Sequence, residues 1–331
     1  MNKVRWGVLS TANFARTRFL PGFMQSEHVD VVAVASRNLE AAQAFASDMG
    51  IPKAYGSYEE LLAAPDIDAI YNPLPNHLHV DWSIKVLEAG KHVLCEKPLG
   101  LNAPDAQRLV EVAAHYPELN AMEAFMFRFH PQWVTAKAWT QAGKIGELRT
   151  IQSFFSYYNV DPSNIRNQAD IGGGAMLDIG CYCTSLARFI FEAEPKRVMG
   201  IVERDPVSKV DRKCSGILEF EAGTSTFTTS TQVSPYQRVH IVGTSGRIEI
   251  EIPFNAPPDV ETRIWLETDD GIEETTFPIC NQYTIEGEVV SKAILEGKPS
   301  PTPLSDAIGN MKVIDAIFES HDKASWIEIP G

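Results

Sequence analysis

The chain has 331 residues, which is enough for two domains of ordinary size. Its apolar fraction of 44% and charged fraction of 22% are typical of a globular protein and exclude disorder and low complexity. The formal net charge of −14, with no cluster of Lys and Arg, excludes nucleic acid as a partner. No apolar run approaches the roughly 18 residues of a membrane span, so we expect no membrane partner either.

Cysteine usage and the N-terminal sequence indicate a cytoplasmic protein. The five cysteines are odd in number and scattered, which is not the pattern of a disulfide framework. The first apolar run is too short for a secretory signal. Cys181 and Cys183 have no His or second cysteine pair at ligand spacing, so we expect no metal site.

Strand-like and helix-like segments alternate over the first third of the chain. Strands are expected at Val4–Leu9, Val29–Ala35, Ala54–Tyr55, Ala69–Asn72 and Lys91–Cys95. Helices are expected at Thr11–Met24, Leu39–Met49, Ser57–Leu62, Val80–Ala89 and Pro104–His115. This alternation predicts an α/β domain of the Rossmann type, a doubly wound parallel sheet that binds its ligand at the carboxyl ends of the strands.

After about Ala121 the pattern changes, which predicts one domain at residues 1–122 and a second, α+β domain at 123–331. Its helices are expected at Pro131–Gln141, Ala175–Phe191 and Leu304–His321. Its strands are expected at Glu147–Tyr158, Arg197–Glu203, Lys213–Glu219, Ser225–Thr231, Arg238–Val242, Gly246–Ile252, Thr262–Leu266 and Glu273–Phe277. Their alternation predicts a large open sheet, predominantly antiparallel, whose helix-free face pairs with a second subunit in a homodimer or higher homo-oligomer.

The turn after the first strand is a candidate cofactor site. Its residues, Ser10-Thr11-Ala12-Asn13-Phe14, replace the usual Gly-x-Gly-x-x-Gly pattern with Ser10, Ala12 and Ala15. Small residues let the backbone approach a pyrophosphate at a helix N-terminus. An ordinary strand–helix turn packed by small residues is the alternative interpretation.

The end of the second strand favours NADP over NAD. NAD-binding domains place Asp or Glu there to hold the ribose hydroxyls, whereas this chain has Ser36-Arg37. A guanidinium and a hydroxyl suit a 2′-phosphate and do not replace a carboxylate on a free diol. A solvated loop arginine is the alternative.

Three further segments complete the pattern: Asn72-Pro73-Leu74-Pro75-Asn76-His77-Leu78-His79, Glu96-Lys97-Pro98, and Gly172-Gly173-Gly174 leading to Asp178-Ile179-Gly180-Cys181-Tyr182. Their order and spacing resemble the GFO/IDH/MocA oxidoreductase family over nearly the whole chain. Within it, Ser36-Arg37, Glu123–Pro131 and Tyr182 are similar to the branch of NADP-dependent D-xylose dehydrogenases, dimeric dihydrodiol dehydrogenases and glucose-fructose oxidoreductase.

Hydride transfer from an alcohol needs a base for the hydroxyl proton beside the nicotinamide. A tyrosine with an ordinary pKa near 10 is a poor base at neutral pH, and a neighbouring ammonium favours its phenolate. We therefore predict Tyr182 as the acid/base, Lys97 as its tuner and a substrate ligand, and Asp178 as the orienter, four residues before Tyr182 on one helix face. The alternatives are that Lys97 is a surface lysine, that Tyr182 is a packed core aromatic, and that Asp178 is an acid in the first turn of a helix.

The resemblance implies further contacts. Pro73, Leu74, Asn76 and His79 would line the nicotinamide pocket, and Glu96 would approach the cofactor. Arg128 would reach the cofactor or close a cleft between the domains, and Tyr283 would approach the cofactor from the second domain. Arg166 is a candidate substrate contact, and His79 is equally compatible with a structural role.

The resulting expectation is an oxidoreductase that converts the anomeric hydroxyl of a cyclic sugar to a lactone with NADP. Reduction of a keto-sugar and oxidation of a dihydrodiol use the same residues and remain open, as do the sugar, its anomer, the direction, and dimer against tetramer. Two other classes that share the fold are a non-catalytic NADP-binding regulator and an NAD-dependent glycosidase.

Overall fold

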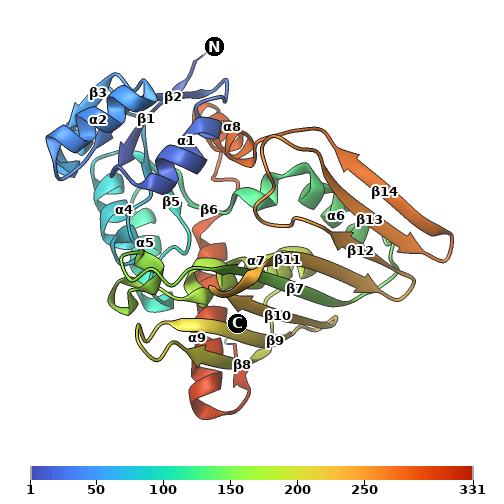
Figure 1. The fold of residues 1–331 in the computed structure, drawn as a ribbon. Coiled ribbons are helices and arrows are strands. Elements are labelled where there is room, and N and C mark those ends of the chain that lie inside the picture. Colours follow the sequence, from blue (N-terminus) through green and yellow to red (C-terminus); the bar gives the residue numbers. More distant parts are fainter. Residues whose placement is uncertain (1, 330–331) are drawn as a thin grey trace. The chain divides into compact units, whose positions relative to one another are not determined.

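Residues 2–329, which the computed structural model describes, form one six-stranded sheet and one nine-stranded sheet (Figure 1). The six-stranded sheet lies in a first unit, made of the residues up to Met126 together with Asn281–Ile308. The nine-stranded sheet lies in a second unit, made of Phe127–Cys280 together with the residues from Gly309 on. The expected division at residue 122 differs from these units in two respects: the first unit extends to Met126, and Asn281–Ile308 packs with the N-terminal part of the chain.

The first sheet is parallel throughout, with strand order β3-β2-β1-β4-β5-β6. Its strands are β1 (Val4–Leu9), β2 (Val29–Ala35), β3 (Lys53–Tyr55), β4 (Ala69–Asn72), β5 (His92–Glu96) and β6 (Ala121–Ala124). This is the strand order of a Rossmann domain, so the predicted doubly wound fold is confirmed. The sequence reading missed β6, a four-residue strand.

Several helices of the first unit begin at polar caps. The helices of this unit are α1 (Leu20–Phe23), α2 (Leu39–Met49), α3 (Tyr58–Ala63), α4 (His79–Glu88), α5 (Ala103–Ala113) and α8 (Gln282–Leu295). The side chains of Asn38, Ser57 and Asn102 accept hydrogen bonds from backbone N–H groups three residues on, at 3.1, 3.2 and 2.8 Å. Such caps satisfy donors that the first helical turn leaves without a partner.

Two helical segments depart from the expectation. The first helix is irregular: after Asn13 and Phe14 it contains a π-helical turn over Ala15–Phe19, which leads into α1. Helix α8 was not predicted, because Gly287 and several β-branched residues weaken its helical pattern. Tertiary packing supports α8: a Cβ on Gly287 would lie 2.8 Å from Phe23 Cδ2, and Trp6 Nε1 donates to Ser291 Oγ at 3.0 Å.

The second sheet has the order β14-β13-β12-β11-β7-β10-β9-β8-β15. Its strands are β7 (Leu148–Tyr158), β8 (Arg197–Arg204), β9 (Asp211–Glu219), β10 (Thr224–Ser230), β11 (Gln232–Gly243), β12 (Gly246–Ile250), β13 (Thr262–Thr268), β14 (Gly271–Phe277) and β15 (Ile327–Glu328). Strands β7 and β10 pair in parallel, and the other described pairs are antiparallel. The predicted α+β domain with a large, mostly antiparallel sheet is therefore confirmed.

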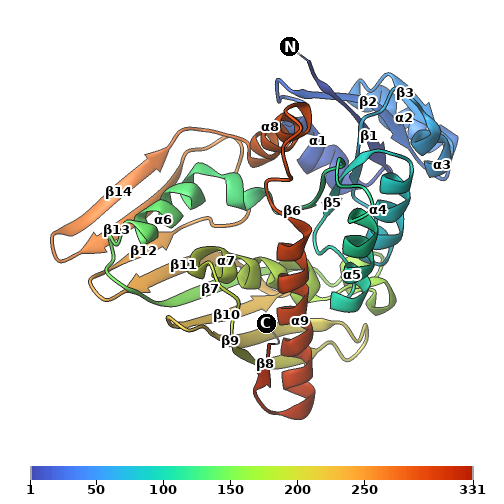
Figure 2. The ribbon, with the colours of Figure 1, turned by 180° about the vertical axis from the view of Figure 1, so that it is seen from behind.

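Helices α6 (Pro131–Gln141), α7 (Cys181–Phe191) and α9 (Leu304–Lys323) lie on the same face of this sheet, as the two views show (Figures 1 and 2). The residues that the strands turn toward these helices are buried, as period-two alternation requires, among them Ile151 and Phe155 of β7 and Ile241 of β11. On the opposite face Ile201 is 69% exposed and Ile272 is 68% exposed. Within residues 2–329, every helix is too short or too polar to cross a lipid bilayer.

Candidate active site

The turn after β1 adopts the backbone geometry of a cofactor-binding turn. Ser10 has φ of 71°, the left-handed region that glycine favours, at the position of the first glycine in the usual pattern. Its Oγ accepts a hydrogen bond from the backbone N–H of Ala12 at 3.3 Å. Thr11, Ala12 and Phe14 are partly exposed and Asn13 is exposed, so this turn presents backbone and small side chains to the surface.

The predicted 2′-phosphate residues lie beside that turn. Leu9, the last residue of β1, pairs with Ala35, the last residue of β2, so Ser10 and Ser36 follow neighbouring strand ends. Arg37 is exposed, and Ser36 Oγ accepts from the backbone N–H of Asn38 at 3.3 Å. A guanidinium therefore stands at the carboxyl edge of the sheet, where Rossmann domains bind the adenosine ribose.

His79 joins the loops that follow β4 and β5. One ring nitrogen lies 2.6 Å from the carbonyl oxygen of Leu74, and the other lies 2.7 Å from that of Pro98. The side chain is 1% exposed, and burial lowers its pKa to about 4. The described contacts give His79 a structural role: it connects Leu74, in the loop after β4, with Pro98, the residue that follows Lys97. Direct contacts of His79, Pro73, Leu74 and Asn76 with a cofactor stay predictions.

Two glutamates and two tyrosines gather in the first unit. The hydroxyl of Tyr71 donates to Glu96 Oε1 at 2.7 Å. Glu286 of α8 is fully buried, and neither carboxyl oxygen has a hydrogen-bond partner among the described residues. Burial and the nearby Glu96 raise the pKa of Glu286 well above its ordinary value.

Tyr283 also belongs to the first unit, because α8 packs there. Its ring lies 6.1 Å, centroid to centroid, from that of Phe14 in the cofactor turn and 5.4 Å from that of Phe19. The expectation that Tyr283 reaches the cofactor from the second domain is corrected accordingly: it lies beside the cofactor turn within the same unit. Its contact with a cofactor stays a prediction.

In the second unit Asp178 is held by two side chains. The hydroxyl of Tyr157 donates to its Oδ2 at 2.5 Å, and Arg166 Nε lies 3.0 Å from its Oδ1. The Asp178 side chain is 11% exposed and that of Arg166 is 34% exposed. Asp178 raises the pKa of Arg166 most, and Tyr157 and Tyr182 raise it further, while burial lowers it. These groups form a polar cluster that the sequence reading found only in part, since it missed Tyr157.

Tyr182 follows a π-helical turn, Met176–Gly180, which contains Asp178. The segment from Asp178 to Tyr182 is therefore not one regular α-helix, and the prediction that the two side chains share a face stays a prediction. Three aromatic rings surround Tyr182, those of Phe127, Phe155 and Phe254, at centroid distances of 5.7, 5.8 and 5.4 Å. The ring is thus fixed by packing, and the residue is 4% exposed.

Arg128 supports the same helix. Its Nε and Nη2 donate to Ser185 Oγ at 3.2 and 2.7 Å, and its guanidinium lies 5.5 Å from the ring centre of Phe189. Because Arg128 is 7% exposed, these contacts make it a support of α7. Its contact with a cofactor stays a prediction, as does the meeting of Lys97, in the first unit, with Tyr182, in the second.

A parallel sheet in Rossmann order and a half-buried Asp–Arg–Tyr cluster in an α+β unit are typical of a nucleotide-binding oxidoreductase. The chain belongs to the GFO/IDH/MocA oxidoreductase family. Residues 4–123 match the oxidoreductase family with an NAD-binding Rossmann fold, and residues 133–249 match the GFO/IDH/MocA C-terminal domain. The suspected family is thereby confirmed.

Similar proteins act on sugars and related diols. The chain is 35% identical to the D-xylose 1-dehydrogenase (NADP(+)) 2 of Haloferax volcanii, over 98% of this chain and 99% of that protein. It is 35% identical to the trans-1,2-dihydrobenzene-1,2-diol dehydrogenase of Xenopus laevis, over 95% and 97%. The crystal structure of a 3-ketoreductase from Actinomadura kijaniata, in complex with NADP and TDP-benzene, matches with a TM-score of 0.90 and 31% identity, over 96% and 98%.

Proposed function

We propose that this protein is an NADP-dependent oxidoreductase that transfers a hydride between the nicotinamide and a cyclic sugar, oxidising the C1 hydroxyl of an aldose such as D-xylose to a lactone. The observation that carries the proposal is the half-buried cluster of Asp178, Arg166 and Tyr157, in which Asp178 belongs to the turn that leads into the helix of Tyr182. Such a cluster suits a substrate rich in hydroxyl groups. The NADP-dependent xylose dehydrogenase among the relatives supports this choice of substrate.

The residues of the first unit fit NADP. The left-handed Ser10 lets the turn present its backbone N–H groups to a pyrophosphate, and Ser36 and Arg37 stand where a 2′-phosphate needs donors and positive charge. The 3-ketoreductase structure that contains NADP supports the same cofactor. Bound in its oxidised form, NADP supplies the hydride acceptor.

The chain's own groups manage the proton and the substrate. In the proposed reaction the phenolate oxygen of Tyr182 takes the proton of the C1 hydroxyl as the C–H hydride leaves, and the Lys97 ammonium stabilises that phenolate. Arg166 and Tyr157 hold Asp178 in its charged form, since one is a cation and the other a hydrogen-bond donor. Asp178 then accepts a hydrogen bond from a neighbouring sugar hydroxyl and orients the ring.

The purified protein with NADP⁺ and a panel of pentoses, hexoses and aromatic dihydrodiols tests the proposal, with formation of NADPH as the readout. We expect turnover with at least one aldose and a loss of roughly 10²–10⁴ in kcat for Tyr182→Phe. Near-normal turnover of that variant would overturn the role of Tyr182. Absence of turnover with every polyol would overturn the dehydrogenase.

The same panel separates the alternatives. Turnover only with dihydrodiols, or only as NADPH-dependent reduction of a keto-sugar, would replace the aldose, and both activities occur among the relatives. Tight NADP binding without turnover of any substrate would identify a regulator. Release of free sugar from a glycoside without net NADPH would identify a glycosidase.

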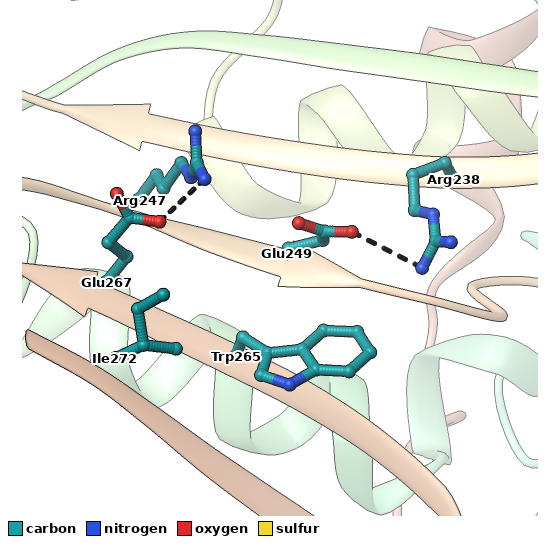
Figure 3. Close-up of a pocket in the computed structure, with 6 residues that line it drawn as sticks. All are labelled: Arg238, Arg247, Glu249, Trp265, Glu267 and Ile272. Carbon is teal, nitrogen blue, oxygen red and sulfur yellow. Dashed lines mark ion pairs between the residues drawn. The ribbon is translucent and has the colours of Figure 1, made fainter.

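We also propose a homodimer formed through the helix-free face of the second sheet. A groove of about 280 Å³ on this sheet is lined by Arg238, Arg247, Glu249, Trp265, Glu267 and Ile272. Figure 3 shows the paired charges that flank Trp265 there, Arg247 with Glu267 at 2.6 Å and Arg238 with Glu249 at 3.3 Å. A face that carries apolar side chains and both signs of charge suits a second copy of itself. Light scattering tests the assembly: we expect a dimer or a larger oligomer, and a monomer at micromolar concentration would contradict it.

A further inference from the structure

A buried aspartate lies under the glycine loop that leads into the Asp178 turn. Asp211, the first residue of β9, is 3% exposed. Its Oδ2 accepts a hydrogen bond of 2.6 Å from the backbone N–H of Met176, the first residue of the π-helical turn. A carboxylate at this place satisfies an N–H group that has no helical partner.

The loop itself is built around that carboxylate. Gly174 has φ of 122°, and a Cβ at Gly174 would overlap Asp211 Oδ1. On the other side the backbone N–H of Gly174 donates to the carbonyl oxygen of Arg166 at 2.9 Å. A Cβ on Gly173 would lie 2.6 Å from that same oxygen. The glycine loop is therefore confined between the Asp211 carboxylate and the backbone of Arg166.

This arrangement links Asp211 to the polar cluster on both sides. Met176, which Asp211 holds, lies two residues before Asp178, and Arg166, which the loop holds through its carbonyl, pairs with Asp178 through its side chain. Burial raises the pKa of Asp211 to about 7, while the backbone donors and Arg204 lower it. The buried thiol of Cys214, on the same strand, also lies near Asp211.

We propose that Asp211 is a positioning residue, which fixes the Gly172–Gly174 loop and the turn after it so that Asp178 meets Arg166 and Tyr157 in the geometry the reaction needs. The inference rests on the proposed function, because hydride transfer to or from a sugar is the step that requires Asp178 and Tyr182 in place. It extends that function to a residue outside the family motif.

Asp211→Asn tests the proposal, because the amide keeps the size and an acceptor oxygen but loses the charge. We expect kcat to fall by roughly 10- to 100-fold, since misplacement of a catalytic group by about 1 Å has effects of this order, while the Kd for NADP stays within about twofold. Asp205→Asn is the matched control. The carboxylate of Asp205 also accepts backbone N–H groups, from Val207 and Ser208 at 2.8 Å, but it lies in the exposed turn before β9. We expect that variant to retain kcat within about twofold.

Gly174→Ala tests the same contact from the loop side and keeps the carboxylate. The added Cβ presses on Asp211 and strains the backbone at φ of 122°, so its effect on kcat should be similar. With Asp211→Ala as the second single variant, the double variant Gly174→Ala/Asp211→Ala should lose less than the product of the two single losses. If Asp211→Asn does not fold, the single and double Gly174 variants carry the test. Equal kcat in wild type, Asp211→Asn and Gly174→Ala, or strict additivity, would overturn the proposal.

Hydrogen exchange separates this inference from the proposed function. Backbone amides at Met176–Asp178 should exchange faster in Asp211→Asn than in wild type, and Asp205→Asn should leave them unchanged. This readout needs no substrate. If the wild type turns over no sugar, the proposed function fails while faster exchange still supports the positioning role. Unchanged exchange would overturn the positioning role whatever the activity.

Discussion

In the first unit, the residues predicted to bind the cofactor follow strand ends directly, so the parallel sheet itself brings them together. Ser10 and Ser36, for example, follow the paired residues Leu9 and Ala35. In the second unit, Asp178 depends on partners from separate segments, Tyr157 in β7 and Arg166 before the glycine loop. Backbone geometry therefore organises the first set, and buried side-chain pairing organises the second. Changes in the first should alter cofactor affinity, and changes in the second should alter turnover.

The largest expected effect lies in the second unit. Asp178→Asn removes the charge that pairs with Arg166 and leaves one acceptor oxygen where Arg166 and the Tyr157 hydroxyl now use two. We expect kcat/KM for the sugar to fall by roughly 10²–10³, with the Kd for NADP unchanged, measured by steady-state kinetics and fluorescence titration. Asp170→Asn, in the exposed turn before the glycine loop, is the control and should stay within about twofold. A parallel loss of NADP affinity in Asp178→Asn would break the division between the two units.

The next effect lies in the first unit and concerns the cofactor alone. Arg37→Asp replaces an exposed guanidinium after β2 with the carboxylate that NAD-binding domains use. We expect the KM for NADP to rise by roughly 10- to 100-fold and the KM for NAD to fall, with kcat at saturating cofactor changed by less than about threefold. The ratio of kcat/KM for the two cofactors is the measurement. Unchanged NADP affinity would refute the assignment of Arg37.

The difference between the two units also explains which parts of the fold and of the site can be predicted from the sequence. Strands β1, β2 and β4 were predicted residue for residue, since short apolar runs between turn signals mark buried parallel strands. Helix α8 was missed because its stability comes from contacts with α1, β1 and β2, far away in sequence. The sequence therefore predicts which residues belong to the motifs, but not which side chains contact them in the folded protein.

Tyr157 shows what signal was available. Ile151, Ser153 and Phe155 are buried and share one face of β7, and Tyr157 continues that period of two toward the helix-covered side. Alternation thus identifies an inward tyrosine near the end of the strand. No local pattern states that its hydroxyl meets Asp178, because 21 residues separate the two along the chain.

A smaller effect, on stability, distinguishes two glutamates of α8. Glu286 is buried with a raised pKa, so above the ordinary glutamate pKa the unfolded chain releases a proton that the folded chain keeps, and stability falls as pH rises. Glu286→Gln removes this penalty. We expect it to raise the midpoint of thermal unfolding by roughly 2–4 °C at neutral pH, with no gain near pH 4.

Glu288 on the same helix is the control with the opposite sign. Burial raises its pKa, but hydrogen bonds from Ser26 at 2.7 Å and His28 at 2.6 Å outweigh this and lower it overall. Its stabilisation is present above the ordinary pKa and is lost as pH falls, so Glu288→Gln should lower the midpoint at neutral pH. Equal shifts of one sign in both variants would contradict the assigned protonation states.

The smallest effect concerns the cofactor turn. Ser10 holds φ of 71°, a conformation that costs an L-residue about 1 kcal/mol and glycine almost nothing. Ser10→Gly relieves this strain but gives up the 3.3 Å hydrogen bond from Ala12 and adds entropy to the unfolded chain. We therefore expect a free energy of unfolding between unchanged and about 1 kcal/mol higher, with the Kd for NADP within about twofold. Ser36, after β2, does not have a positive φ. We therefore expect Ser36→Gly to lower the free energy of unfolding by about 0.5–1 kcal/mol. If urea unfolding shows equal losses for both variants, the backbone of Ser10 is not strained, and its turn is not the glycine-type turn on which the NADP assignment depends.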